Sequence, residues 1–358
     1  MFIVLIITSM RFFWGGYMPT VMLLLLFFLI VSFVLTYLLR IYAFKNNIID
    51  TPNSRSSHVI PTPRGGGVAI VIIFLIGLAI FYFQGYLTTL TTVGLIVSGG
   101  VIAIVGFWDD HGHIAARWRL MAHFSSAAFL LFCLGGFPPL TIFGTIIYLG
   151  IVGNILGLLF LVWMLNLYNF MDGIDGLASA QAVMVSLGAI VIYIISGDKV
   201  GLDNYLVLWL LAVTVLGFLL WNFPPAKIFM GDAGSGFLGL IIGSLAISAG
   251  WIESKFFFCW LILLGLFIVD ATWTLIRRIL GGFKVYEAHR SHGYQIASRR
   301  FKRHLPVTLS AIVINIVWLF PIALLVGLNT INPMVALIIA YAPIIYLDYK
   351  LDAGVKNN

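Results

Sequence analysis

Residues 150–176 read GIVGNILGLLFLVWMLNLYNFMDGIDG. The stretch carries no charged residue before Asp172, and a helix needs roughly 20 apolar residues to cross the hydrocarbon core of a bilayer. The apolar residues do not alternate with polar ones, as they would in a strand of a membrane β-barrel. We therefore predict a transmembrane helix over 150–168 that ends in a polar motif.

The same pattern recurs along the whole chain. Of its 358 residues, 61% are hydrophobic and 9% are charged, whereas a soluble domain is about a quarter charged. The length rule predicts an all-α integral membrane protein with about eleven transmembrane helices, and residues 18–350 form one polytopic domain. The expected helices are 20–42, 67–83, 90–107, 118–135, 150–168, 177–196, 204–222, 235–252, 256–276, 306–326 and 332–347.

The basic residues indicate how the helices are oriented. Seventeen of the 20 Lys and Arg residues fall in gaps on one side of the predicted bundle, and only Arg11, Lys199 and Lys255 fall on the other. Cytoplasmic loops carry such an excess, so we predict an outside N-terminus and a cytoplasmic tail at 351–358. Residues 1–17 form an N-terminal extension to which we assign no function. The orientation signal accounts for the net charge of +7, and no nucleic-acid partner is expected.

The acidic residues gather on the same side. An ion-coupled transporter or flippase, the non-enzymatic alternative, would place ionisable groups near the midplane. Only Asp270 lies there, and we expect it to pair with Arg277 or Arg278 on its own helix. The asymmetry favours cytoplasmic loops that form an active site fed from the cytosol. The acids on this side include Asp109, Asp110, Asp172, Asp175 and Asp232.

The polar motif after 150–168 has a regular spacing. Asn166, Asn169, Asp172 and Asp175 recur every three positions, which places their oxygens along one face of a helix end and turn. Carboxylate and amide oxygens suit Mg²⁺, particularly where substrate phosphates complete the shell. The alternative is a helix end followed by a turn, with Asp175 capping the next helix. That alternative explains one Asp but not four polar positions.

Two further motifs carry acids. Asp109 and Asp110 are adjacent carboxylates, which need a cation, a basic neighbour or a shared proton. The segment Phe229–Met–Gly–Asp232 stands before a predicted helix. Asp232 is either a helix cap or a metal ligand beside N–H groups that favour phosphate.

Two loops carry donors that suit an anionic substrate. The first, from Asp50 to Gly67, is rich in Pro and Gly and could equally be a structural connector. We interpret the later basic cluster of Arg299, Arg300, Lys302 and Arg303 as an attraction to anionic lipid. The candidate substrate-binding residues are Arg55, His58 and Arg64 in the first loop, and His289, Arg290 and His292 in the last.

In this order and on one side, the motifs resemble the polyprenyl-phosphate N-acetylhexosamine-1-phosphate transferase family, which includes the MraY, WecA and WbpL groups. The resemblance runs from Asp50 to His292 and is most specific at Asp109–Asp110, 166–177 and Phe229–Asp232. It implies transfer of N-acetylhexosamine-1-phosphate from a UDP-sugar to undecaprenyl phosphate in the inner membrane, with release of UMP. Such a step initiates a lipid-linked cell-surface glycan of the O-antigen type. Whether the chain forms a homodimer is left open.

The resemblance also implies roles for single residues. Asp109 and Asp110 are tied to the lipid phosphate and to catalysis. Asp232 and Asn169 are associated with Mg²⁺, for which Mn²⁺ can substitute, and Asp175 lies near uracil. We expect Asp109 to deprotonate or position the lipid phosphate, although a two-step route with a carboxylate nucleophile is left open. Asn166 and Asp172 are expected to bind substrate.

The sugar is less well defined by the resemblance. The form His289–Arg–Ser–His292 is closest to the WbpL branch, which implies a 6-deoxy sugar such as FucNAc or QuiNAc besides GlcNAc. A CDP-alcohol phosphatidyltransferase is the other enzymatic alternative. That family has Ala–Arg shortly after its Asp–Gly, whereas Asp172–Gly173 is followed by Ile–Asp–Gly–Leu, so the match fails.

Overall fold

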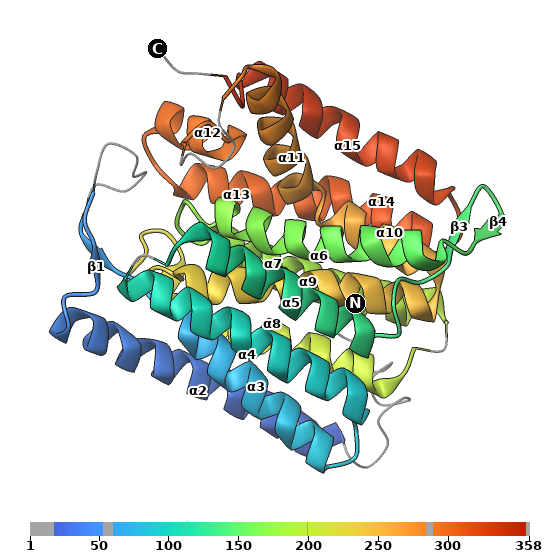
Figure 1. The fold of residues 1–358 in the computed structure, drawn as a ribbon, viewed down its shortest axis with the longest axis horizontal. Helices are drawn as coiled ribbons and strands as arrows, with labels where there is room; N and C mark the ends of the chain where they lie inside the picture. The colour runs from blue at the N-terminus through green and yellow to red at the C-terminus, as the bar shows by residue number, and fades with distance from the viewer. Residues whose placement is uncertain (1–17, 53–59, 113, 199, 284–288, 356–358) are drawn as a thin grey trace.

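The computed structural model describes residues 18–52, 60–112, 114–198, 200–283 and 289–355. Most of its long helices lie side by side in one bundle, which confirms the all-α class (Figure 1). The helices are α2 (Met18–Lys45), α3 (Gly67–Phe83), α4 (Thr89–His111), α5 (Ala116–Cys133), α6 (Gly150–Met171), α7 (Leu177–Ser196), α8 (Leu202–Asn222), α9 (Asp232–Ile252), α10 (Ser254–Leu263), α11 (Gly265–Leu280), α12 (Gly293–Phe301), α13 (Leu305–Ile314), η2 (Asn315–Leu319), α14 (Phe320–Gly327) and α15 (Pro333–Lys350).

The helices identify a multi-pass membrane protein. Within the described ranges, eight helical segments are long and apolar enough to cross a membrane, or nine if α10 and α11 form one span. All eleven predicted segments are helical. The two that fall outside this count are α3, which has 17 residues, and α5, which carries Arg117 and Arg119 in its first turns.

Two segments expected to be continuous helices are interrupted. The segment 256–276 bends by 70° between α10 and α11, and the carbonyl of Leu263 beside the bend accepts the side chain of Gln181 at 2.9 Å. Such a partner satisfies a backbone group that a broken helix leaves free in the membrane. The segment 306–326 contains the π-helical turn η2, because Pro321 has no N–H to donate to the preceding turn.

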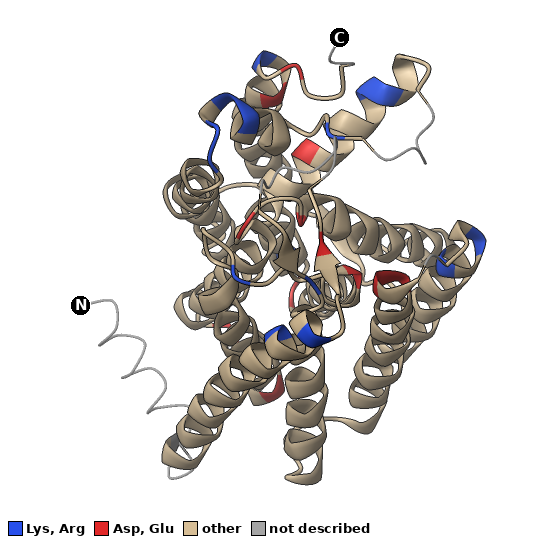
Figure 2. Cartoon of the chain, turned by 90° about the vertical axis from the view of Figure 1, so that its left-hand side faces the viewer, with Lys and Arg blue, Asp and Glu red and all other residues tan. Residues whose placement is uncertain are grey.

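The two ends of the bundle differ. Strands β1 (Ile49–Asp50) and β2 (Thr62–Pro63) pair antiparallel at one end, and the hairpin of β3 (Leu140–Ile142) and β4 (Thr145–Ile147) lies at the other. In Figure 2, which views the end with β1, acidic ribbon segments lie near the middle and basic segments lie around them. This end is the one that the sequence predicts to be cytoplasmic.

Glycines bring two helices, α3 and α4, against the start of α9. A Cβ on Gly106 of α4 would meet the backbone of Ala233 at 2.5 Å, and a Cβ on Gly67 of α3 would meet the Cα of Gly234 at 2.5 Å. Small residues allow membrane helices to approach this closely. As a result, the side chains that follow Gly106 on α4 can reach the first N–H groups of α9.

Candidate active site

Asp110, in the last turn of α4, is buried against the start of α9. Its Oδ1 accepts the N–H of Asp232 at 3.2 Å, and its Oδ2 accepts the N–H of Ala233 at 3.3 Å. Gly231 has a φ of +79°, and a Cβ there would meet Asp110 Oδ2 at 2.6 Å. Arg64 lies on the other side, with its Nε 4.0 Å from Asp110 Oδ1. Asp110 therefore fixes the turn that presents Asp232.

Asp109 and Asp232 are bridged by an arginine that the site prediction did not include. Asp109 accepts the N–H of Ile114 at 3.0 Å and forms an ion pair with Arg119 of α5. The same Arg119 Nη1 lies 3.9 Å from Asp232 Oδ2. The Arg119 side chain is 42% exposed, so it can also bind an anion from outside. The sequence feature that could have identified Arg119 as a site residue is its position in the first turns of the helix after Asp109.

The motif at the end of α6 divides into three parts. The amide nitrogen of Asn169 donates to Asp232 Oδ1 at 2.9 Å and to Ser235 Oγ at 3.0 Å. Asp172 follows α6, and its pKa is raised by burial and by the negative charges of Asp232, Asp110 and Asp175. Asn166 instead donates within its own helix, to the carbonyl of Val162 at 2.6 Å. The structure thus brings Asn169 and Asp172 to the acidic cluster.

The donor set can be compared with what magnesium requires. Among the described residues, no three His, Cys, Asp or Glu side chains are arranged to hold a metal ion by themselves. Mg²⁺ is usually held by one or two carboxylates together with water and substrate phosphates. Asp232 and Asn169 lie side by side, with the amide nitrogen of Asn169 facing Asp232 Oδ1. Once the amide turns its oxygen toward Asp232, the two side chains offer the hard oxygen donors that this mode uses. The ligand assignment stays a prediction.

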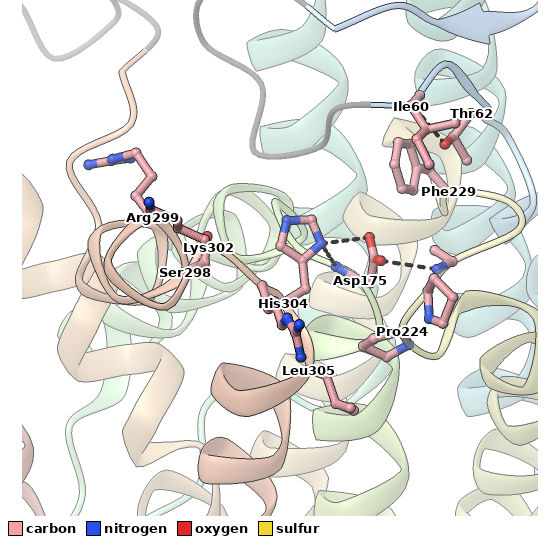
Figure 3. A pocket seen from close by; sticks show the side chains of 13 residues that line it. Ile60, Thr62, Asp175, Pro224, Phe229, Ser298, Arg299, Lys302, His304 and Leu305 are labelled. Atoms are coloured by element: carbon pink, nitrogen blue, oxygen red, sulfur yellow. Dashed lines mark hydrogen bonds and ion pairs between the residues drawn. The ribbon is translucent and has the colours of Figure 1, made fainter.

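A pocket of about 520 Å³ opens beside Asp175 (Figure 3). Asp175 Oδ1 lies 2.9 Å from His304 Nδ1, and Oδ2 accepts the N–H of Ala226 at 3.0 Å. In the figure, the ring of Phe229 lies on one side of this pair and Arg299 on the other. Lys302 and Arg303 also line the pocket. Three of the four cations that we assigned to lipid attraction therefore face a cavity that could hold an anionic ligand.

The alternative in which Asp175 caps the next helix is wrong. The residue at the N-cap of α7 is Gly176, with a φ of +74°, and its N–H donates to Asn222 Oδ1 at 3.1 Å. Asn222 belongs to α8, far away in sequence. A single-sequence pattern gives no sign of this contact.

The loop that contains His289 and His292 is held by Asp270, the acid that we expected to pair with Arg277 or Arg278. Asp270 of α11 instead lies 3.2 Å from His292 Nδ1 and accepts the N–H of Gly293 at 3.0 Å. Helix α12, which begins there, was not anticipated by the apolar-run rule because it is short and polar. His292 is 3% exposed.

The remaining predicted residues lie around this loop or outside the described residues. His289 is partly buried and Arg290 is exposed. The hydroxyl of Tyr294 donates to the carbonyl of Phe170 at 2.7 Å, so α12 is tied to the end of α6. Arg55 and His58 lie outside the residues that the structure describes.

The site contains acids bridged by an exposed arginine, at one end of a membrane helix bundle and beside a pocket lined by cations. These features define an integral membrane enzyme that transfers a phosphate-linked group. The family model for glycosyl transferase family 4 matches residues 92–250. The chain belongs to that family of sugar-phosphate transferases, as the similarity of full-length relatives also shows.

Three relatives illustrate the similarity. The chain is 32% identical to the probable undecaprenyl-phosphate N-acetylglucosaminyl 1-phosphate transferase of Bacillus subtilis, over 89% of this chain and 88% of the relative. It is 26% identical to the undecaprenyl-phosphate alpha-N-acetylglucosaminyl 1-phosphate transferase of Thermotoga maritima, over 76% and 80%. It is 35% identical to the phospho-N-acetylmuramoyl-pentapeptide-transferase of Streptococcus pneumoniae, over 52% and 59%.

Proposed function

We propose that this chain transfers N-acetylhexosamine-1-phosphate from a UDP-sugar to undecaprenyl phosphate and releases UMP. The observation that carries the proposal is the bridge from Asp109 through Arg119 to Asp232. It places a cation between two acids at the end of a membrane bundle, where a lipid phosphate and a water-soluble donor can meet. The names of the relatives support both the sugar-phosphate and the polyprenyl acceptor.

The reaction forms one P–O bond and breaks another. An oxygen of the lipid phosphate attacks the β-phosphorus of the UDP-sugar, and UMP leaves with the oxygen that had joined its phosphorus to that atom. Phosphoryl transfer depends mainly on positioning and on charge neutralisation. Arg119 binds the lipid phosphate, and Asp109 positions that phosphate or accepts its proton. A two-step route, in which a carboxylate attacks first, is the alternative mechanism.

The donor is held by the other side of the site. Asp232 and Asn169 would bind Mg²⁺, which neutralises the charge of the diphosphate when bound. The pocket beside Asp175 receives the uridine, with the ring of Phe229 available for stacking. The cations Arg299, Lys302 and Arg303 that line this pocket attract the phosphates. The polyprenyl tail lies against the apolar outer surfaces of the helices.

The donor sugar and the orientation are part of the proposal. GlcNAc is the first sugar to test, because two relatives are named for it, and FucNAc and QuiNAc follow from the His–Arg–Ser–His form. The excess of basic residues at the active-site end supports a site that faces the cytoplasm from the inner membrane. The product would start a lipid-linked cell-surface glycan.

The test is UMP release by the purified full-length protein in nanodiscs with Mg²⁺ and undecaprenyl phosphate. A panel of UDP-GlcNAc, UDP-FucNAc and UDP-QuiNAc identifies the donor, and mass spectrometry detects the lipid product. We expect UMP only when lipid and donor are both present. Asp203→Asn is the control, since Asp203 begins α8 at the opposite end from the site. Absence of UMP with every donor would contradict the proposal.

A further inference from the structure

Asp270 is a buried acid that the proposed reaction does not use. One oxygen accepts the N–H of Gly293 at 3.0 Å, and the other accepts the N–H of Tyr294 at 2.9 Å. These are the first two N–H groups of α12. A negative charge at a helix N-terminus is stabilised by such groups. Asp270 therefore anchors the start of α12 although it belongs to α11.

The same carboxylate fixes the ring of His292. An ionised carboxylate can only accept hydrogen bonds, so the His292 Nδ1 that lies 3.2 Å from Asp270 Oδ1 carries a proton. The ring is packed against the rings of Tyr294 and His289, with centroid distances of 5.8 and 5.0 Å. Because His292 is almost fully buried and its Nδ1 faces inward, it is better suited to support a neighbour than to contact the substrate.

The ring of His289 has the opposite pattern, with no proton on Nδ1. Its Nδ1 accepts the backbone N–H of Ser291 at 3.5 Å and lies 3.1 Å from Ser291 Oγ. A backbone N–H can only donate, so this nitrogen is unprotonated and the neutral ring carries its proton on Nε2. Burial lowers the pKa of His289 to about 4, in agreement with a neutral ring. His289 thus offers one N–H donor.

Both rings lie beside the end of α6. The ring of Phe170 is 6.1 Å from that of His292, and the carbonyl of Phe170 accepts the hydroxyl of Tyr294. Phe170 directly follows Asn169, whose amide contacts Asp232. The imidazole pair is therefore next to the segment that we propose to hold the donor diphosphate.

We infer that Asp270 is a positioning residue: it holds His292 and the start of α12, and through them it places the Nε2–H of His289 for a hydrogen bond to the diphosphate of the donor. The identity of this ligand rests on the proposed function. The contacts from Asp270 to His292 and from Ser291 to His289 do not depend on it.

The experiment compares Asp270→Asn with the full-length protein in nanodiscs. We expect kcat to fall about tenfold to a hundredfold, as for other residues that orient a functional histidine, with a smaller change in KM for the UDP-sugar. The control is Asp203→Asn. Asp203 lies in the first turn of α8, at the opposite end of the bundle, and this variant should stay within about threefold of the parent, because substitutions at distant sites without shared partners act independently.

A spectroscopic readout separates this inference from the proposed function. ¹⁵N NMR of labelled histidines should show a protonated Nδ1 for His292 and an unprotonated Nδ1 for His289, assigned with single His→Gln variants. Asp270→Asn should shift the His292 signal. These signals need no substrate, so they still test the positioning role if no donor is turned over.

A second variant guards against misfolding of Asp270→Asn. In His292→Asn the amide nitrogen can still donate to Asp270, but no ring remains to pack on His289. We expect this variant to fold and to lose kcat to a similar extent. The inference is overturned if Asp270→Asn leaves the ¹⁵N signals unchanged, or if either variant keeps the parent kcat.

Discussion

Asp110 accepts the backbone N–H of Asp232 at 3.2 Å, so one acid of the site holds another in place. The two residues are 122 positions apart in the chain, and they meet because Gly106 lets α4 lie against the first turn of α9. Both carboxylate oxygens of Asp110 accept N–H groups of this turn. Asp232 keeps its carboxylate directed toward Asn169 and Arg119. The geometry thus separates a positioning acid from one that can bind a ligand.

Asp110→Asn should lower stability as well as activity. The amide has only one oxygen, so one of the N–H groups of Asp232 and Ala233 loses its acceptor, which costs about 1–3 kcal/mol. The measurements are the thermal unfolding midpoint in detergent and the rate of UMP release. Asp232→Asn is the comparison: it should abolish most activity and raise the Mg²⁺ requirement with little change in unfolding midpoint. Equal midpoints for the two variants would contradict the separation of roles.

Arg119 should determine the affinity for the lipid phosphate. Replacing it with Met removes a charge-assisted hydrogen bond, which corresponds to about tenfold to a hundredfold in KM for undecaprenyl phosphate. Arg119→Lys keeps the charge but not the paired donors of the guanidinium, so we expect an intermediate KM. The measurement is UMP release against the concentration of the lipid. A change in KM for the UDP-sugar alone would assign Arg119 to the donor.

The sequence allowed prediction of those features that depend on local pattern. Apolar runs predicted where the helices are, and the excess of Lys and Arg predicted which ends of the helices gather together. The three-residue spacing predicted that Asn169 and Asp172 lie near one another, and the structure places Asn169 in contact with Asp232. In each case the physical cause lies within about 20 neighbouring residues, so one sequence contains it.

Other features depend on residues that are far apart in the chain. Arg119 was counted only as an orientation signal, because its bridge to Asp232 joins two helices whose packing is not encoded locally. Asp270 was assigned to its own helix, although its partner His292 is 22 positions away. The bend at Leu264 also depends on a distant partner, Gln181. The WbpL-type sugar preference and the individual catalytic roles remain predictions.

His289 should make the protein less stable in acid. The unfolded chain protonates this residue near its ordinary pKa of 6.5, whereas the folded protein resists protonation down to about 4. Between these values the unfolded state binds more protons, so stability falls as the pH falls from 6.5 to 4. In His289→Asn the unfolding midpoint should depend less on pH in this window. Parallel curves for parent and variant would show that His289 is already charged in the folded protein.

The segment after α15 should support the active site, although the sequence suggested only a cytoplasmic tail. The N–H of Gly354 donates to the carbonyl of Ser291 at 2.8 Å, and Arg277 donates to the carbonyl of Ala353 at 3.1 Å. Ser291 in turn donates to His289. A chain that ends at Leu351 loses this support, so the ring of His289 should be less well placed.

We expect that truncation to lower kcat about tenfold, the loss typical of a residue that orients a functional group, while the protein still inserts and folds because α15 is retained. The matched control ends at Val355 and keeps both contacts. Rates of UMP release from the two truncated proteins in nanodiscs give the comparison. If the two rates agree, the contact between Gly354 and Ser291 has no part in positioning His289.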